Sequence, residues 1–269
     1  MSGLPTHESR GLLAGRVAIV SGIGPGMGRD VSLALAREGA DLVLAARTAS
    51  KIGEVAAEVR AAGRRAIEVP TDITSVADCQ RLAERAMAEF GRIDVLVNNA
   101  FDMGGFIRME DASADDLLRP LRVNLIGSMQ LTHEVLPVMK AQRSGSIVMI
   151  NSMIVRDVLP NMGPYGASKA ALLAATQGLA REVGVHGIRV NSVVPGYIWG
   201  ASLEGFFAHQ AKQRGVDPQV VYDEVAAQTA LRHLPTSEEI ADAVVFFASD
   251  LARVVTGQSL DVNGGHVFH

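Results

Sequence analysis

The chain contains 269 residues, of which 48% are hydrophobic and 20% are charged. It can therefore bury a large core, and global disorder is excluded. The 25 Lys and Arg residues against 29 Asp and Glu residues give a net charge of −4, which offers no basic surface for nucleic acid. Cys79 is the single cysteine, so a disulfide framework and a cysteine-clustered metal site are excluded as well.

The beginning of the chain and its apolar stretches bear on where the protein resides. Residues 1–10 are polar and contain Pro5, so we expect a disordered or loosely ordered segment there rather than a signal peptide. No apolar stretch approaches the roughly 20 residues that a membrane-spanning helix needs. We expect a cytoplasmic protein with no membrane partner, in which residues 11–269 form a single domain.

Short apolar runs alternate with segments of helical periodicity along the chain. The runs predict strands, in order, at Arg16–Ser21, Asp41–Ala46, Arg65–Pro70, Asp94–Asn98, Gly145–Asn151, Ile188–Val194 and Ser259–Val262. The periodic segments predict helices at Gly28–Arg37, Lys51–Ala62, Ser75–Phe90, Ser113–Lys140, Tyr165–Val183 and Ser237–Ser249. Ser75 is the expected N-cap of its helix.

The predicted strands are apolar throughout, which is typical of parallel strands covered by helices on both faces. Because each parallel crossover needs a helix, the alternating order predicts an α/β fold with a doubly wound sheet. The irregular stretch Gly196–Leu234 breaks this order and contains Trp199, Phe206, Phe207 and Tyr222. Since a long insertion in a compact domain usually serves binding, we expect a substrate lid at about residues 197–230.

A glycine-rich turn, Ser21–Gly28, lies between the first predicted strand and the first helix. Glycines allow the backbone to approach a pyrophosphate, and the following helix N-terminus offers free N–H groups to that anion. A purely structural turn is the alternative. The position in a βαβ unit favours a dinucleotide site, and hence a dinucleotide-binding domain over residues 11–269.

The second predicted strand ends at Ala46 and is followed by Arg47 and Thr48, with no carboxylate. An NAD site is expected to have an acidic residue there for the ribose 2′-hydroxyl. Arg47 can instead pair with a 2′-phosphate, and Thr48 can add a hydroxyl contact. The sequence therefore favours NADP(H), with NAD(H) as the alternative if Arg47 is only a solvated turn residue; Pro25 weakens the case, because the turn itself has no basic residue.

Tyr165 and Lys169 open the helix that follows the fifth predicted strand, four residues apart and on one helix face. A nearby cation favours the phenolate and is expected to lower the pKa of Tyr165, so that it can exchange a proton with a substrate oxygen. Ser152 ends the same strand and can stabilise developing charge on that oxygen. The alternative for Tyr165 and Lys169 is an ordinary helix surface, and the alternative for Ser152 is a cap at the end of a strand. The histidines show no metal-ligand spacing, and we expect no metal.

These residues together resemble the short-chain dehydrogenases/reductases, over about Gly11 to Val267. The matching features, in chain order, are Ser21–Gly28, Asp72, Asn98-Asn99-Ala100, Asn124, Ser152, Tyr165–Lys169, Pro195-Gly196, Thr256-Gly257-Gln258 and Asn263-Gly264-Gly265. The resemblance implies a Rossmann-type sheet of seven strands and a homotetramer, with a homodimer as the alternative.

The resemblance also implies a role for each matching residue. Tyr165 is the acid/base, Ser152 polarises the carbonyl, Lys169 lowers the pKa of Tyr165 and binds the nicotinamide ribose, and Asn124 holds a proton-relay water. The cofactor-binding residues are then Ser21, Gly22, Gly26, Met27, Gly28, Arg47, Thr48, Asp72, Ile73, Asn98, Ala100, Tyr165, Lys169, Pro195, Gly196 and Ile198. Asp72 and Ile73 contact the adenine, and Ile198 contacts the carboxamide. Gly200 stands where a threonine of the family often helps to hold the carboxamide, so that side-chain contact is missing here.

Apolar residues near these positions indicate the substrate. The candidates for the substrate pocket are Phe101, Met103, Met153, Trp199 and Phe206. Phe101 stands where the resembling family usually has a glycine, so its ring can shape the cleft. We expect hydride transfer between NADP(H) and a hydrophobic ketone or secondary alcohol, cyclic or steroid-like.

Three alternatives stay open. One is an NAD-dependent dehydrogenase of a 3-hydroxy acid, and another is a 3-oxoacyl-thioester reductase. The third is a non-catalytic protein that senses the dinucleotide and binds a partner, or that acts as a scaffold. The presence of Tyr165, Lys169, Ser152 and Asn124 argues against a sensing protein, but a scaffold is harder to exclude, because interface helices look like any amphipathic helix.

Overall fold

The computed structural model describes residues 11–268, so the expectation for residues 1–10 lies outside it. Seven strands form one sheet in the order β3-β2-β1-β4-β5-β6-β7, and every pair is parallel. The strands are β1 Val17–Ser21, β2 Asp41–Ala46, β3 Ala66–Pro70, β4 Val95–Asn98, β5 Gly145–Ile150, β6 Ile188–Pro195 and β7 Ser259–Val262. The predicted Rossmann-type, doubly wound sheet is confirmed.

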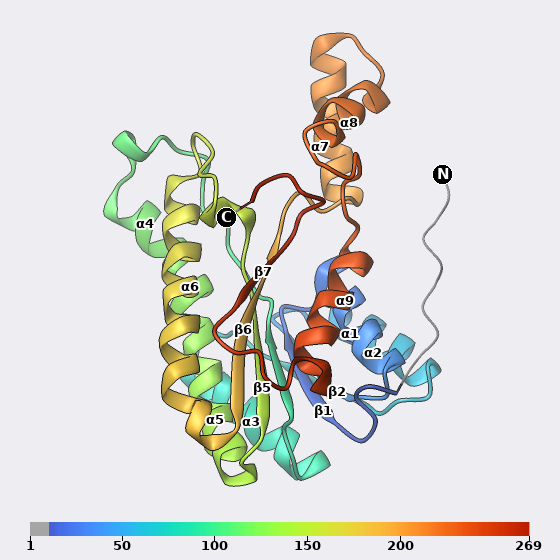
Figure 1. Cartoon of the computed structure of the whole chain (residues 1–269), viewed down its shortest axis with the longest axis vertical. Helices are drawn as coiled ribbons and strands as arrows, with labels where there is room; N and C mark the ends of the chain where they lie inside the picture. Colours follow the sequence, from blue (N-terminus) through green and yellow to red (C-terminus); the bar gives the residue numbers. More distant parts are fainter. Residues whose placement is uncertain (1–10, 269) are drawn as a thin grey trace.

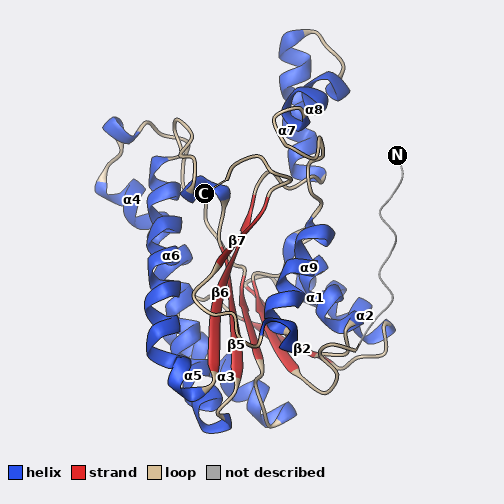
Figure 2. Cartoon of the chain, viewed as in Figure 1, coloured by secondary structure: helices blue, strands red, loops and turns tan. Residues whose placement is uncertain are grey.

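Helices cover both faces of the sheet (Figures 1 and 2). One face carries α1 Met27–Arg37, α2 Ala49–Ala61 and α9 Ser237–Ala248; the other carries α3 Val76–Phe90, α5 Ser128–Gln142 and α6 Gly163–Val183. Along β1, Ala18 and Val20 enter the first core, whereas Val17 and Ile19 enter the second. Burial on both sides explains why the strands are apolar throughout.

Local signals set the ends of these helices. The Ser75 side chain accepts a hydrogen bond from the Asp78 amide and caps α3, as predicted.

Short 3₁₀ turns lie at Met109–Asp111, Met153–Val155, Gly184–His186 and Asp250–Ala252. No helix within residues 11–268 is long and apolar enough to cross a membrane.

The long helix predicted at Ser113–Lys140 is present but has a widened turn in its middle. It consists of α4 Ala114–Leu121, a π-helical segment Arg122–Gly127, and α5. A Cβ on Gly127 would lie 2.8 Å from Ile73 Cγ1, so this turn passes close to the loop after β3. π-helical turns often occur at functional sites, and this one contains the fully buried Asn124.

The stretch Gly196–Leu234 is helical, so the expectation of an irregular segment is wrong. It forms α7 Ala201–Arg214 and α8 Pro218–Ala226, which stand beyond the carboxyl edge of the sheet (Figure 1). The pair has a small core of its own, made of Phe207, Ala211, Val221, Ala226 and Leu234. Three of the four aromatic residues in this stretch, Trp199, Phe207 and Tyr222, pack the two helices against each other.

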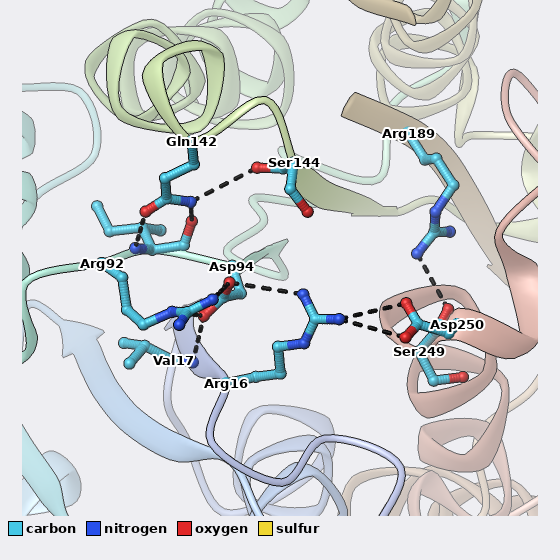
Figure 3. Close-up of polar contacts among 10 residues, drawn as sticks. Arg16, Val17, Arg92, Asp94, Gln142, Ser144, Arg189, Ser249 and Asp250 are labelled. Carbon is cyan, nitrogen blue, oxygen red and sulfur yellow. Dashed lines mark hydrogen bonds and ion pairs between the residues drawn. The ribbon is translucent and has the colours of Figure 1, made fainter. Parts of the chain in front are cut away.

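At the opposite edge of the sheet, Asp94 joins the beginnings of β1 and β4 (Figure 3). Its side chain is 2% exposed and accepts hydrogen bonds from the Val17 amide at 2.9 Å and from the Arg92 guanidinium at 2.8 and 2.7 Å. Arg16 lies 3.6 Å away and bridges to the exposed Asp250. A buried carboxylate with this many donors fixes the relative position of the two central strands.

Replacing Asp94 with alanine should lower the free energy of unfolding by about 3–5 kcal/mol, because two arginines and a strand amide lose a buried partner. Asp250→Ala removes a carboxylate that is 78% exposed and is the matched control; its loss should stay below about 1 kcal/mol. Urea denaturation measures both. Equal losses would contradict the role given to Asp94.

Candidate active site

Two glycines at the turn between β1 and α1, Gly22 and Gly28, have no room for a side chain. Gly22 has a φ of +87°, and a Cβ there would overlap the backbone of Ala100. A Cβ on Gly28 would overlap the Gly22 carbonyl oxygen, which also accepts a hydrogen bond from Asn99 Nδ2 at 2.8 Å. The turn therefore lies directly on the end of β4, where a pyrophosphate can approach bare backbone.

Two cavities meet at the carboxyl edge of the sheet, and Asn99 and Phe101 line both. The larger has a volume of about 750 Å³, extends from the glycine turn past the ends of β2 and β3, and is called the nucleotide cleft below. The smaller, of about 170 Å³, is called the catalytic cavity. Its lining residues are Met27, Asn99, Phe101, Ile150, Asn151, Ser152, Tyr165, Lys169, Pro195, Gly196 and Ile198.

The nucleotide cleft has an excess of positive charge. Its lining includes the cations Arg47, Lys51, Arg119 and Arg122 and the carboxylates Asp72 and Asp102. Asp72 accepts hydrogen bonds from Thr74 at 2.9 and 2.7 Å, and Asp102 pairs with Arg119 at 3.0 Å. Within residues 11–268, the side chains of Arg47, Lys51 and Arg122 make no hydrogen bond or ion pair. The bare glycine turn and the unpaired cations fit a phosphorylated dinucleotide.

Ser152 and Tyr165 lie together in the catalytic cavity, and the Ser152 hydroxyl forms a hydrogen bond with the phenol. Ser152 is held from both sides, because its amide donates to Asn151 Oδ1 at 3.0 Å and its hydroxyl accepts from the Ile154 amide at 3.3 Å. Asn151 Nδ2 in turn donates to the Lys169 carbonyl at 3.2 Å. The end of β5 and the start of α6 are thereby joined at the site.

Burial shifts the pKa of both titratable side chains of the catalytic cavity, Tyr165 and Lys169. It raises the pKa of Tyr165 to about 12, although the hydrogen bond from Ser152 opposes this. It lowers the pKa of Lys169 to about 7. The Lys169 ammonium lies 5.8 Å from the Tyr165 ring centre and donates to the Ile150 carbonyl at 2.8 Å. The expected lowering of the Tyr165 pKa by Lys169 is therefore wrong for this structure, because desolvation favours the neutral form of both groups.

Asn124 connects the π-helical segment to the loop after β4. Its side chain accepts from the Asp102 amide at 2.8 Å and donates to the Asp102 carbonyl at 2.9 Å. It also donates to Ser168 Oγ at 2.8 Å. The side chain thus fixes the loop that contains Phe101 and Asp102 against α6, the helix that contains Tyr165 and Lys169.

The structure brings most of the predicted cofactor residues to the two cavities. Gly22, Arg47, Thr48, Asp72, Ile73 and Ala100 line the nucleotide cleft, while Met27, Pro195, Gly196 and Ile198 line the catalytic cavity with Tyr165 and Lys169. Gly26 and Gly28 belong to the glycine turn. Ser21 lies below the surface, where its hydroxyl donates to the Val97 carbonyl at 3.3 Å.

The side chain of Asn98, which is among the expected cofactor residues, also lies below the cleft and lines neither cavity. It donates to Thr132 Oγ1 at 3.1 Å and to the Met149 sulfur at 3.3 Å, and its exposed fraction is 2%. Side chains alternate along a strand, so it is the next residue, Asn99, that reaches the cavities. The asparagine pair was visible in the sequence, but its pattern alone did not say which member faces the cleft.

Of the five residues predicted for the substrate pocket, only Phe101 lines the catalytic cavity. Phe101, 59% exposed, lines both cavities, but Met103 lines the nucleotide cleft only. Met153 is buried against Gly196. Trp199 packs on Tyr222 with ring centres 4.6 Å apart, and Phe206 lies on the outside of α7, 52% exposed. Trp199 thus helps to hold the helix pair α7–α8 together, whereas Phe206 stays largely exposed.

Residues that the sequence analysis did not single out also line the nucleotide cleft. Lys51 lies four residues after Arg47 and lines the same cleft, together with Asp102, Arg119 and Arg122. Helical spacing from Arg47 could have indicated Lys51. The other three come from the loop after β4 and from the α4–π-helical region, which no local pattern places beside β2. Within the described part of the chain, no group of three or more potential metal ligands is present.

A doubly wound sheet with a nucleotide cleft at its carboxyl edge and a buried Tyr–Lys pair beside a serine defines a nicotinamide-dependent oxidoreductase. The comparisons agree. A protein-family profile described as "Enoyl-(Acyl carrier protein) reductase" matches residues 22–267. The chain belongs to the short-chain dehydrogenase/reductase family, whose members use NAD(H) or NADP(H) to act on alcohols and carbonyl groups.

Characterised relatives cover nearly the whole chain. The 1,6-dihydroxycyclohexa-2,4-diene-1-carboxylate dehydrogenase of Acinetobacter baylyi is 35% identical over 255 residues, 93% of this chain and 95% of that protein. The 7alpha-hydroxysteroid dehydrogenase of Escherichia coli strain K12 is 32% identical over 255 residues, 95% of each chain. A solved structure of NAD+-bound xylitol dehydrogenase superimposes with a TM-score of 0.86 at 32% identity, covering 94% of this chain and 99% of that one.

The buried Lys169 should make folding stability depend on pH. Its pKa is about 7 in the folded protein against 10.5 in an unfolded chain, so between these values the unfolded state binds the extra proton and stability rises with pH. The free energy of unfolding of the wild type, relative to Lys169→Met, should rise by about 2 kcal/mol from pH 7 to pH 9.

Urea denaturation at several pH values measures this difference. Lys140→Met, at an exposed position of α5, is the matched control. The free energy of unfolding of the wild type relative to Lys140→Met should not rise over this interval. A wild-type stability that falls relative to Lys169→Met over this interval would contradict the burial argument.

Proposed function

We propose that this protein is an NADP(H)-dependent reductase of hydrophobic ketones, cyclic ketones among them. The observation that carries the cofactor preference is the end of β2, where Arg47 and Lys51 line the nucleotide cleft without a hydrogen bond or ion pair to any described residue. No carboxylate follows β2 to take a ribose 2′-hydroxyl. A 2′-phosphate supplies the missing counter-charge, in a charge-assisted geometry that arginine favours.

When bound, the nicotinamide supplies or accepts the hydride at the carbinol carbon. Tyr165 is protonated at neutral pH, because burial raises its pKa to about 12, and it can donate that proton to a carbonyl oxygen. Ser152, fixed by Asn151 and the Ile154 amide, donates a second hydrogen bond to the same oxygen. We assign Lys169 to the nicotinamide ribose and Asn124 to the water that resupplies the proton.

The substrate class follows from the walls of the catalytic cavity. Met27, Phe101, Ile150, Pro195 and Ile198 supply apolar surface around the polar atoms of Ser152 and Tyr165. Such a cavity favours an apolar body with one carbonyl oxygen. Two relatives are named for alcohols on rings, a steroid and a cyclohexadiene, which supports a cyclic substrate. We assign Trp199 and Phe206 of α7–α8 to a lid over its outer end.

A second candidate is an NAD-dependent dehydrogenase of a hydroxy acid or polyol. The xylitol dehydrogenase of similar structure is NAD+-bound, and that likeness favours this candidate. This second candidate function requires the Arg47 side chain to point into solvent. In either case we expect a homotetramer or homodimer, since the edge strand β7 and the loop before it expose Leu251, Val254 and Leu260.

Arg47→Gln should weaken NADPH binding at least about tenfold, the loss of one charge-assisted phosphate contact. NADH binding should change by less than about twofold, because the contact is specific to the 2′-phosphate. Titration followed by reduced-nicotinamide fluorescence gives both constants. Arg60→Gln, on α2 but paired with Glu68 outside the cleft, is the control. Wild-type protein that binds NADH more tightly than NADPH would favour the second candidate.

Tyr165→Phe should reduce turnover of a bulky cyclic ketone by about 10²–10⁴-fold, the usual contribution of a positioned acid. NADPH should bind as before, since the ring remains in place. Tyr222→Phe removes a hydroxyl that lies 3.5 Å from the Leu234 amide, outside both cavities, and should keep its activity. Turnover of small polar ketones far above that of apolar cyclic ones would refute the substrate class.

A further inference from the structure

Asp102 places a fixed negative charge in the nucleotide cleft, across from Arg47. Arg47 follows β2 and Asp102 belongs to the loop after β4, and β1 lies between those two strands in the sheet. Both side chains line the same cleft at its carboxyl edge. A nucleotide bound in this cleft would therefore lie near both a cation and a carboxylate.

The position of Asp102 is fixed by four contacts. Its amide and carbonyl both bond to the Asn124 side chain, at 2.8 and 2.9 Å. Its Oδ1 accepts from the Gly104 amide at 2.7 Å, and Gly104 has a φ of +68°, which suits the tight turn. Its Oδ2 accepts from Arg119 Nε at 3.0 Å. The carboxylate cannot turn away from the cleft without breaking this set.

Arg47 and Arg119 both act on that carboxylate. Partial burial opposes its ionisation, but the Gly104 amide and the guanidinium groups of Arg119 and Arg47 outweigh burial and lower the pKa of Asp102. Arg47 makes no hydrogen bond with Asp102, so its effect acts through space. Arg119 is 65% exposed and neutralises Asp102 only in part.

We propose that Asp102 is a specificity-determining residue that opposes a 2′-phosphate at Arg47, and that Arg119 sets the strength of this opposition by neutralising Asp102. The inference rests on the proposed function, in which Arg47 reads the 2′ position. It assigns the cofactor preference to three charges on two sides of the cleft. Arg119 is then a positioning and screening residue that acts through Asp102 rather than a phosphate ligand.

The test measures dissociation constants of NADPH and NADH by calorimetry and takes their ratio as the NADPH preference. Asp102→Asn keeps an oxygen for the Gly104 amide and removes the charge; the preference should rise about three- to tenfold, as expected for one charge at several ångströms in a hydrated cleft. Arg119→Gln exposes the charge of Asp102, and the preference should fall by a similar factor.

The double variant Asp102→Asn/Arg119→Gln separates a screening role from a direct one. If Arg119 acts through Asp102, the double variant should match Asp102→Asn. A loss of NADPH affinity on Arg119→Gln that is equal with and without Asp102 would show a direct phosphate contact and overturn the inference. Arg108→Gln, which breaks the exposed Arg108–Glu110 pair outside the nucleotide cleft, should leave the ratio unchanged.

Arg47→Gln distinguishes this inference from the proposed function. If it lowers the NADPH preference while Asp102→Asn has no effect, the three-charge arrangement is wrong and the proposed function stands. If Arg47→Gln has no effect while Asp102→Asn raises the preference, Asp102 acts without Arg47, so the proposed role of Arg47 and the three-charge arrangement are both wrong. No effect of either variant would overturn both.

Discussion

The site depends first on the parallel pairing of β1 with both β2 and β4. Parallel strands present their carboxyl ends at one edge, so the loops after β1, β2, β4 and β5 all open on the same side. The glycine turn after β1 lies on Ala100 so closely that Gly22 has no room for a Cβ. That contact brings the phosphate-binding backbone, the Arg47 side and the Asp102 side of the cleft within reach of one nucleotide.

The second constraint is the widened turn in the long helix between β4 and β5. The π-helical segment contains Asn124, whose side chain bonds both polar backbone groups of Asp102 and the Ser168 hydroxyl. One amide therefore joins the loop that lines the nucleotide cleft to the helix that supplies Tyr165 and Lys169. Any shift of this loop also changes the environment of the catalytic pair, because they share a fully buried connection.

Much of this architecture could be predicted because it follows short-range rules. Unbroken apolar strands, the Ser75 cap and the glycine turn each have a local cause, and together they give the sheet and the location of the site. Side-chain direction is harder to predict, since the adjacent Asn98 and Asn99, at and just after the end of β4, point their side chains to different surroundings. The charges around Arg47 could not be predicted, because Asp102 and Arg119 meet it only after β1, β2 and β4 have paired.

The helix pair α7–α8 shows how the same composition supports two interpretations. Clustered aromatic residues suggest a ligand site, yet Trp199, Phe207 and Tyr222 pack mainly on one another. Two short helices beyond the sheet cannot share its core, so they need apolar residues of their own to stay folded. The apolar lining of the catalytic cavity comes instead from Ile150 and Pro195 at the strand ends and from Met27 at the start of α1. Under the proposed function, the rigid part of the molecule would therefore set the shape of the substrate, and the helix pair would act only on the part of the substrate that extends beyond the catalytic cavity.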